Sequence, residues 1–463
     1  MFELVQKNWL KFVDEARRAD LGPAPYVTRE FEEFLGCGIL AKGFVRLKCE
    51  NCDENKFVPF SCKRRGFCPS CCGRRMNEGA AFFVDNVFPH VPVRQWVLSF
   101  PMPVRFWMAR NPHLITHALQ IFHRAMKSHY RQAAKKIGVV GEIHTGAVTV
   151  VQRFGSALNL NIHFHALLLD GVFVIERDLG DGVTTPKFIE TPKPAQEEVL
   201  ALMQTIQERM LRLFRRRGLV SEFESEAPAE GSQDQASIEA MCQGASVQYR
   251  LALGAMPGRR VRRIGSLGFI GEQPMADGEL SAVIAGYSLH ANTYVHKNNR
   301  TELERLCRYV LRPPVSEERI EIRGTSAVYK LKSQWNDGTS SILLSGTEFI
   351  EKLVAIIPQP RIHLTRFHGV LAPHSKIREK VVPAKASAAH EPEPELSNAQ
   401  KPLRAHRLGW SELLKRVFNV DLTRCPSCGG QIKFIAAITN ADAIGKILKH
   451  LGLSITPPQF EPP

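Results

Sequence analysis

The sequence of 463 residues predicts an α+β protein in which an antiparallel sheet and its helices follow a cysteine-rich N-terminal domain resembling a zinc ribbon. Segments 146–154 and 159–171 read as strands, and the short break between them predicts an antiparallel hairpin. Apolar residues recur at helical spacing in segments 111–136 and 301–312. Paired cysteines between positions 49 and 71 are typical of a small zinc-binding domain.

The charge balance favours a polyanionic partner. Lysine and arginine together number 61 against 46 acidic residues, which gives a formal charge of +15 and ranks nucleic acid first and an anionic membrane second. No apolar run reaches the roughly 18–20 residues of a membrane-spanning helix, and no signal peptide is expected. Eleven cysteines, mostly in Cys-x-x-Cys pairs, favour metal-bound thiolates in a reducing cytosol over disulfides.

Two Cys-x-x-Cys pairs follow a helical lead-in over residues 1–36. Fifteen residues separate the pairs, as in a four-thiolate zinc ribbon in which each pair aims two sulfurs at one ion. Cys37 and Cys62 are either additional ligands or reduced core thiols. The four expected zinc ligands are Cys49, Cys52, Cys68 and Cys71.

A third pair, Cys425 and Cys428, supplies half of a zinc site. Its partners could be Cys37 and Cys62 or a second copy of the chain, and it could equally bind nothing. The sequence leaves these alternatives open.

Five basic residues surround the second cysteine pair of the expected zinc ribbon. A run of charge is usually a solvated face, but here it lies on a rigid zinc scaffold in a basic protein. Contact with phosphate groups is therefore the preferred interpretation. The residues are Lys63, Arg64, Arg65, Arg74 and Arg75.

The strand over residues 159–171 carries two histidines on one face. Side chains alternate along a strand, so His163 and His165 point to the same side while Ile162 and Phe164 point into a core. Two imidazoles held on a stiff strand form half of a metal site. The alternative is a pair of structural histidines that only form hydrogen bonds.

The third metal ligand is expected from the neighbouring strand of the hairpin. Gln152 lies on segment 146–154 and could reach the same ion through its amide oxygen. His144, at the far end of the hairpin, is the alternative.

Tyr309 lies on the predicted helix over residues 301–312, which ends at a Pro-Pro pair. A helical tyrosine is usually a core or surface aromatic. Three arginines lie close to it in sequence, however, and could bind a phosphate or stabilise a phenolate. They are Arg305, Arg308 and Arg312.

Three motifs in this order resemble the IS91-type transposases: segment 49–71 with its cysteines, His163-Phe164-His165, and segment 306–314 around the tyrosine. That family consists of rolling-circle transposases of the HUH endonuclease superfamily, and it includes the common-region relatives linked to resistance genes. The similarity runs from about residue 30 to the C-terminal cysteine pair.

The resemblance implies a five-stranded antiparallel sheet, with the histidines on a central strand and a tyrosine helix packed across it. It implies that His163 and His165 bind the catalytic metal and that Tyr309 is the nucleophile in single-stranded DNA cleavage. The founding members resemble a two-tyrosine enzyme with tyrosines four residues apart. Arg305 stands four residues before Tyr309, so the single-tyrosine branch is expected.

The expected partners are single-stranded DNA at transposon ends and target DNA. A homo-oligomer is an open alternative to a monomer. The expected location is the bacterial cytoplasm, in association with the nucleoid.

The chemistry agrees with this resemblance. A phenol is a weak nucleophile at neutral pH, and a divalent ion can polarise the scissile phosphate and stabilise the leaving 3′-oxygen. Two imidazoles suit Mn²⁺ better than Mg²⁺, but a site completed by Gln152 and water could take either ion.

Two other functions compete with transposition. A plasmid-type replication initiator or relaxase shares the same chemistry, and a non-catalytic, zinc-dependent nucleic-acid-binding protein needs only the zinc ribbon and the charge.

The expected domain organisation follows from these motifs. A β-hairpin is expected over segment 323–344, with its turn at Asp337-Gly338, and short helices over 348–356 and 410–418. The predicted parts are a helical lead-in with the zinc-binding domain (1–88), a HUH-type tyrosine nuclease domain (89–335) with a flexible insertion near 221–240, an accessory region (336–383), a linker (384–403) and a C-terminal segment (404–463).

Overall fold

The computed structural model describes residues 1–177, 184–220, 237–254, 256–265, 279–383, 416 and 423–462. The predicted linker and most of the predicted insertion lie outside these residues. So does the helix expected over 410–418, apart from Arg416.

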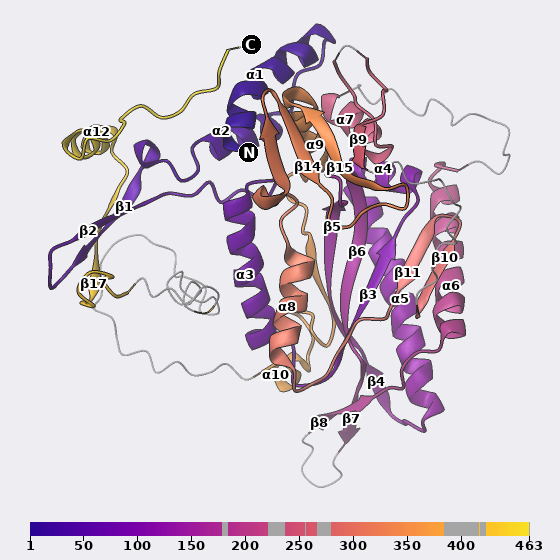
Figure 1. Ribbon diagram of the computed structural model, residues 1–463. Coiled ribbons are helices and arrows are strands. Elements are labelled where there is room, and N and C mark those ends of the chain that lie inside the picture. Colours follow the sequence, from indigo (N-terminus) through magenta and orange to yellow (C-terminus); the bar gives the residue numbers. More distant parts are fainter. Residues whose placement is uncertain are drawn as a thin grey trace.

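A seven-stranded antiparallel sheet forms the centre of the protein (Figure 1). Its strand order is β10-β11-β3-β6-β5-β16, and the short strand β12 also pairs with β3. The sheet has two more strands than the resemblance implied. The strands are β3 (Val93–Ser99), β5 (Gly146–Phe154), β6 (Leu160–Leu169), β10 (Ser281–Ile284), β11 (Tyr287–His290), β12 (Tyr294–Val295) and β16 (Thr365–Gly369).

The predicted hairpin is confirmed, because β5 and β6 pair antiparallel and β6 also pairs with β3. Side chains alternate along β6 between two cores. Ile162 and Phe164 pack with α5 (Pro112–Lys136) and α6 (Gln196–Arg216) on one face of the sheet. Leu167 and Leu169 belong to the core on the other face.

That other face is covered by α3 (Pro69–Asn86) and α8 (Arg300–Leu311), which lie side by side in Figure 1. Phe83 and Val84 of α3 pack with Leu306 and Val310 of α8. A helix that begins at the cysteine-rich region therefore supports the helix that carries Tyr309.

The N-terminal helices α1 (Phe2–Arg18) and α2 (Pro25–Leu35) confirm the predicted helical lead-in. They pack with α9 (Gly346–Ile356), beside a four-stranded sheet of order β13-β14-β15-β9. The predicted hairpin is present as β14 and β15, with Gly338 in the left-handed conformation (φ 82°) at its turn. The strands of this sheet are β9 (Arg262–Gly265), β13 (Ile320–Arg323), β14 (Ser326–Lys330) and β15 (Thr339–Ser345).

The C-terminal strand β17 (Ile432–Ile438) pairs antiparallel with β1 (Phe44–Cys49), which pairs in turn with β2 (Asn55–Pro59). Helix α12 (Ala441–His450) follows, so the two ends of the chain share one small sheet. The remaining elements are η1 (Leu40–Lys42), α4 (Met102–Arg110), β4 (Glu142–His144), β7 (Gly171–Arg177), β8 (Thr184–Glu190), α7 (Ile238–Val247), η2 (Glu317–Arg319) and α10 (Arg378–Val381). Within the described ranges, each helix is too short or too polar to cross a membrane.

Candidate active site

His163 and His165 lie on the central strand β6 and face the same side of the sheet as α8. Their Nε2 atoms are 3.0 Å apart, and both side chains are buried. The pairing that sequence alternation predicts is therefore present, with two nitrogen atoms converging on one point.

The other nitrogen of each ring is held by a specific partner. Nδ1 of His163 donates to the carbonyl oxygen of Asn161 at 2.8 Å, because a carbonyl can only accept. Nδ1 of His165 is hydrogen-bonded to the side-chain amide of Gln95 at 2.7 Å. Sequence analysis missed Gln95. A polar residue in the middle of an apolar strand indicated a special role, but the sequence did not indicate contact with His165.

Burial keeps both imidazoles neutral. It lowers the pKa of His163 to about 4, with the cations Arg312 and Arg105 acting in the same direction. Burial, followed by the neighbouring His163, also lowers the pKa of His165 well below its usual value. A neutral imidazole is the form that binds a metal ion.

Gln152 of β5 lies directly across the strand pair from His163. Its Nε2 atom donates to the carbonyl oxygen of Val310 at 2.7 Å, which fixes the amide against α8. Its Oε1 atom is buried and has no hydrogen-bond partner among the described residues. An unsatisfied buried oxygen beside two converging imidazoles fits a metal ion. The alternative His144 lies in β4, which pairs with β7 in a different sheet, so the structure does not bring it to the histidine pair.

Tyr309 lies on the last turn of α8 and packs edge-on against His165. The ring centroids are 5.7 Å apart and the rings are nearly perpendicular, at 87°. Tyr309 keeps 37% of its surface exposed, although it lies beside buried residues. The side chain therefore combines contact with the histidines and access for a substrate.

Two cations lie over the ring of Tyr309. The guanidinium carbon of Arg312 is 4.6 Å from the ring centroid, and Nζ of Lys332 is 4.4 Å from it. Burial raises the pKa of Tyr309, but Arg312 and Lys332 together outweigh burial, so the net pKa lies below the usual 10. Lys332 was missed by sequence analysis because it follows β14, far from the tyrosine in sequence.

The other predicted arginines of α8 are placed differently. Arg308 donates to Glu304 at 2.8 Å, and Arg416 also binds this carboxylate. Arg305 is exposed one turn before Tyr309. The structure therefore brings only Arg312, among the three, into contact with the tyrosine ring.

The basic residues of the cysteine-rich region are placed differently from one another, and several of them have protein partners. Arg64 pairs with Glu33, Arg74 pairs with Glu78, and Arg75 donates to the carbonyl oxygen of Lys63. Arg65 and Arg75 line a cavity of about 580 Å³ together with Gln152 and Arg312. The cavity extends from the cysteine-rich region to Gln152 and Arg312, and its lining includes neither Tyr309 nor the two histidines.

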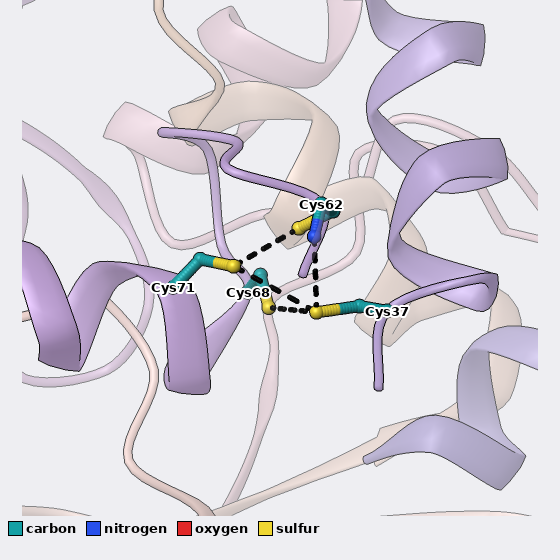
Figure 2. Close-up of side chains that lie close together, drawn as sticks. All are labelled: Cys37, Cys62, Cys68 and Cys71. Atoms are coloured by element: carbon teal, nitrogen blue, oxygen red, sulfur yellow. Dashed lines mark hydrogen bonds between the residues drawn. The ribbon is translucent and has the colours of Figure 1, made fainter. Parts of the chain in front are cut away.

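Eight of the eleven cysteines form two clusters, and the predicted single site of Cys49, Cys52, Cys68 and Cys71 is wrong. Cys37, Cys62, Cys68 and Cys71 form the first cluster, in which sulfur pairs lie 3.4–3.7 Å apart (Figure 2). Cys49, Cys52, Cys425 and Cys428 form the second.

The fold explains why the two pairs of the predicted zinc ribbon separate. Cys49 ends β1, in the hairpin that extends away from the main body (Figure 1), whereas Cys68 is the N-cap of α3. Cys68 and Cys71 instead meet Cys37 and Cys62, which sequence analysis left as either ligands or core thiols. A zinc ion with Zn–S bonds of about 2.3 Å requires sulfur atoms about 3.8 Å apart, so the first cluster fits zinc with little adjustment.

Two family models match this chain. One, described as "Putative transposase", covers residues 146–379, and the other, "Transposase zinc-binding domain", covers residues 4–100. The transposase for insertion sequence element IS801 from Pseudomonas savastanoi pv. phaseolicola is 26% identical over 153 residues. This match covers 32% of the present chain and 34% of that relative, so only about a third of the relative's length is matched. No solved structure matches the chain.

These matches, together with the antiparallel sheet and the cysteine clusters, show that the protein is a transposase. The chain belongs to the IS91-type transposase family, as the sequence motifs predicted.

Proposed function

We propose that this protein cleaves and rejoins single-stranded DNA during rolling-circle transposition, through a 5′-phosphotyrosine intermediate on Tyr309. The observation that supports the proposal best is the position of Tyr309, which is half-exposed, 5.7 Å from His165 between ring centroids, and beside two cations. If Tyr309 had only a structural role, neither a lowered pKa nor an exposed ring would be expected at this position.

In the cleavage step, the Tyr309 oxygen attacks the phosphorus of a DNA phosphodiester. The new bond joins the tyrosine oxygen to the phosphate, and the bond to the 3′-oxygen breaks, so that the released strand ends in a 3′-hydroxyl after taking up a proton. One phosphate ester replaces another. The reverse attack by a 3′-hydroxyl therefore rejoins DNA without ATP and restores the tyrosine.

In this proposal, Arg312 and Lys332 stabilise negative charge on the tyrosine oxygen and on the phosphate. Their charges favour the phenolate form of Tyr309 before attack. They would also stabilise the negative charge that develops on the phosphate. Phosphoryl transfer depends mainly on such positioning and charge stabilisation. Arg305, exposed one turn earlier, would contact the DNA backbone.

His163, His165 and the free oxygen of Gln152 would hold a Mg²⁺ or Mn²⁺ ion. This ion would supply positive charge for the scissile phosphate. The protein's own contribution is to keep both imidazoles neutral by burial and to hold Gln152 in place through its bond to Val310.

The cavity beside Gln152 and Arg312 gives the DNA strand a route toward the cysteine-rich region. It is lined by Arg65 and Arg75 and by the aromatic ring of Phe82, a combination of charge and stacking surface that suits single strands. Transposon ends and target DNA would use this route in turn.

The proposed chemistry uses one tyrosine per active site. Arg305 occupies the position four residues before Tyr309, and Tyr294 lies in β12, where its hydroxyl donates to Glu190. Each cleavage therefore uses Tyr309, and rejoining regenerates the same residue.

The test is incubation of the protein with end-labelled single-stranded DNA from an element end and Mn²⁺. We expect a protein–DNA adduct that resists denaturant and is absent in Tyr309→Phe. A protein that binds the DNA without forming any adduct would favour the non-catalytic alternative. Because an initiator or relaxase would also form the adduct, the second arm is movement of a marked element in cells. Adduct formation without movement would favour that alternative.

A further inference from the structure

Cys425 and Cys428 form part of a metal-ligand set that plays no role in the proposed cleavage. They lie far outside the matched zinc-binding domain, which ends at residue 100, yet their sulfur atoms meet those of Cys49 and Cys52. The Cys49 and Cys428 sulfurs are 3.5 Å apart, and those of Cys52 and Cys425 are 3.7 Å apart. These distances approach the roughly 3.8 Å edge of a tetrahedron of thiolates around zinc.

The backbone around the C-terminal pair has the form of a tight metal-binding turn. The N–H of Cys425 donates to the carbonyl of Gly430 at 2.7 Å, and the N–H of Gly429 donates to the carbonyl of Cys425 at 2.8 Å. Gly429 has φ of 73°, which favours glycine. The N–H of Gly430 points to the sulfur of Cys428 at 3.4 Å, a contact that stabilises a thiolate.

This turn packs closely against the turn that carries the first cysteine pair. A Cβ atom on Gly430 would lie 2.7 Å from the side chain of Asn51, and the N–H of Glu50 donates to the carbonyl of Gln431 at 3.0 Å. Strands β1 and β17 then pair from Cys49 opposite Ile432 onward. The two cysteine pairs are thus brought together by backbone contacts as well as by their sulfur atoms.

The apolar contacts of this region are few. Among the described residues, its hydrophobic cluster has only Phe44, Ile444 and Leu448 as buried members. A core of this size gives little stability by itself, and small domains of this kind commonly depend on a metal ion.

We propose that Cys49, Cys52, Cys425 and Cys428 bind a second structural zinc ion, which fastens segment 423–451 to the β1–β2 hairpin. Four thiolates leave no open coordination position, so the ion is structural and not catalytic. It joins cysteines that are 373 residues apart in the sequence. The ion would therefore join segments from near both ends of the chain.

The two zinc sites differ in access to solvent. Cys52 and Cys428 of the second site are exposed, whereas Cys68 and Cys71 of the first site are buried in the N-terminal core. We therefore expect a chelator to remove zinc from the second site first.

The test is the zinc content of the full-length protein, combined with hydrogen exchange. We expect about two zinc ions per chain in the wild type and about one in the double variant Cys425→Ser/Cys428→Ser. Cys72→Ser is the matched control, because Cys72 adjoins a ligand of the first site but belongs to neither cluster, and it should retain two. In the double variant, the amides of β17 should lose protection while those of β6 keep it.

Retained protection in β6 would show that the double variant is folded. If that variant folds poorly, the wild type treated with chelator replaces it. Loss of zinc from the second site should then expose the amides of β17 to exchange before those of β6. The proposal would be overturned if the wild type bound one zinc ion or if the double variant bound two. It would also be overturned if β17 stayed protected from exchange after zinc had left the second site.

Discussion

Removing the positive charge of Lys332 tests the proposed activation of Tyr309. Its Nζ lies 4.4 Å from the centroid of the tyrosine ring and is exposed to solvent. Two unit charges at that separation interact by about 1 kcal/mol in water, and the exposed position justifies this lower limit. Lys332→Met should therefore raise the pKa of Tyr309 by about 0.7.

The assay has two parts. NMR of ¹³C-labelled tyrosine, assigned with Tyr309→Phe, gives the pKa, and the rate of adduct formation against pH gives its effect on cleavage. Because less phenolate is present at any pH below the pKa, the rate there should fall about fivefold in Lys332→Met. Lys330→Met is the matched control, because that lysine pairs with Glu321. An unchanged pKa in Lys332→Met, equal to that of the control, would refute the reasoning.

Three further predictions concern buried polar groups of the central sheet and of α5, which packs on it. Asp170→Asn removes the negative charge that pairs with buried Arg94 at 2.7 Å and should lower the free energy of unfolding in urea by about 3–5 kcal/mol; a loss below about 1 kcal/mol would contradict this. Burial lowers the pKa of His123 and of His368, the latter to about 4. As the pH falls, these histidines are therefore protonated in the unfolded state at a higher pH than in the folded state. The free energy of unfolding should therefore fall as the pH drops from about 6.5 to 4, and it should fall less in His368→Gln. A free energy of unfolding independent of pH in this range would contradict the lowered pKa values. Gln152→Ala should weaken Mn²⁺ binding about tenfold in calorimetry, and unchanged affinity would remove Gln152 from the ligand set.

Local patterns predicted the central part of the site well. Strand alternation placed His163 and His165 on one face and Phe164 in the core, and the hairpin placed Gln152 opposite His163. The face on which each of these side chains lies depends only on neighbouring residues or on one short turn. The alternation of side chains along a strand, which sets this face, is a property of the backbone.

Contacts between distant segments could not be predicted in the same way. The two Cys-x-x-Cys pairs nearest in sequence suggested one site, but Cys49 and Cys52 meet cysteines from the far end of the chain. Lys332 and Gln95 reach the site only through the packing of separate sheets and strands. Sequence spacing carries no information about which distant elements will pack together.

The most direct test of the central proposal is the identity of the residue bonded to DNA. The adduct formed with single-stranded element-end DNA and Mn²⁺ would be digested with protease and nuclease and then analysed by mass spectrometry. Our account predicts a nucleotide attached through its 5′-phosphate to the peptide that contains Tyr309. A nucleotide on any other residue, or an adduct that persists in Tyr309→Phe, would contradict it.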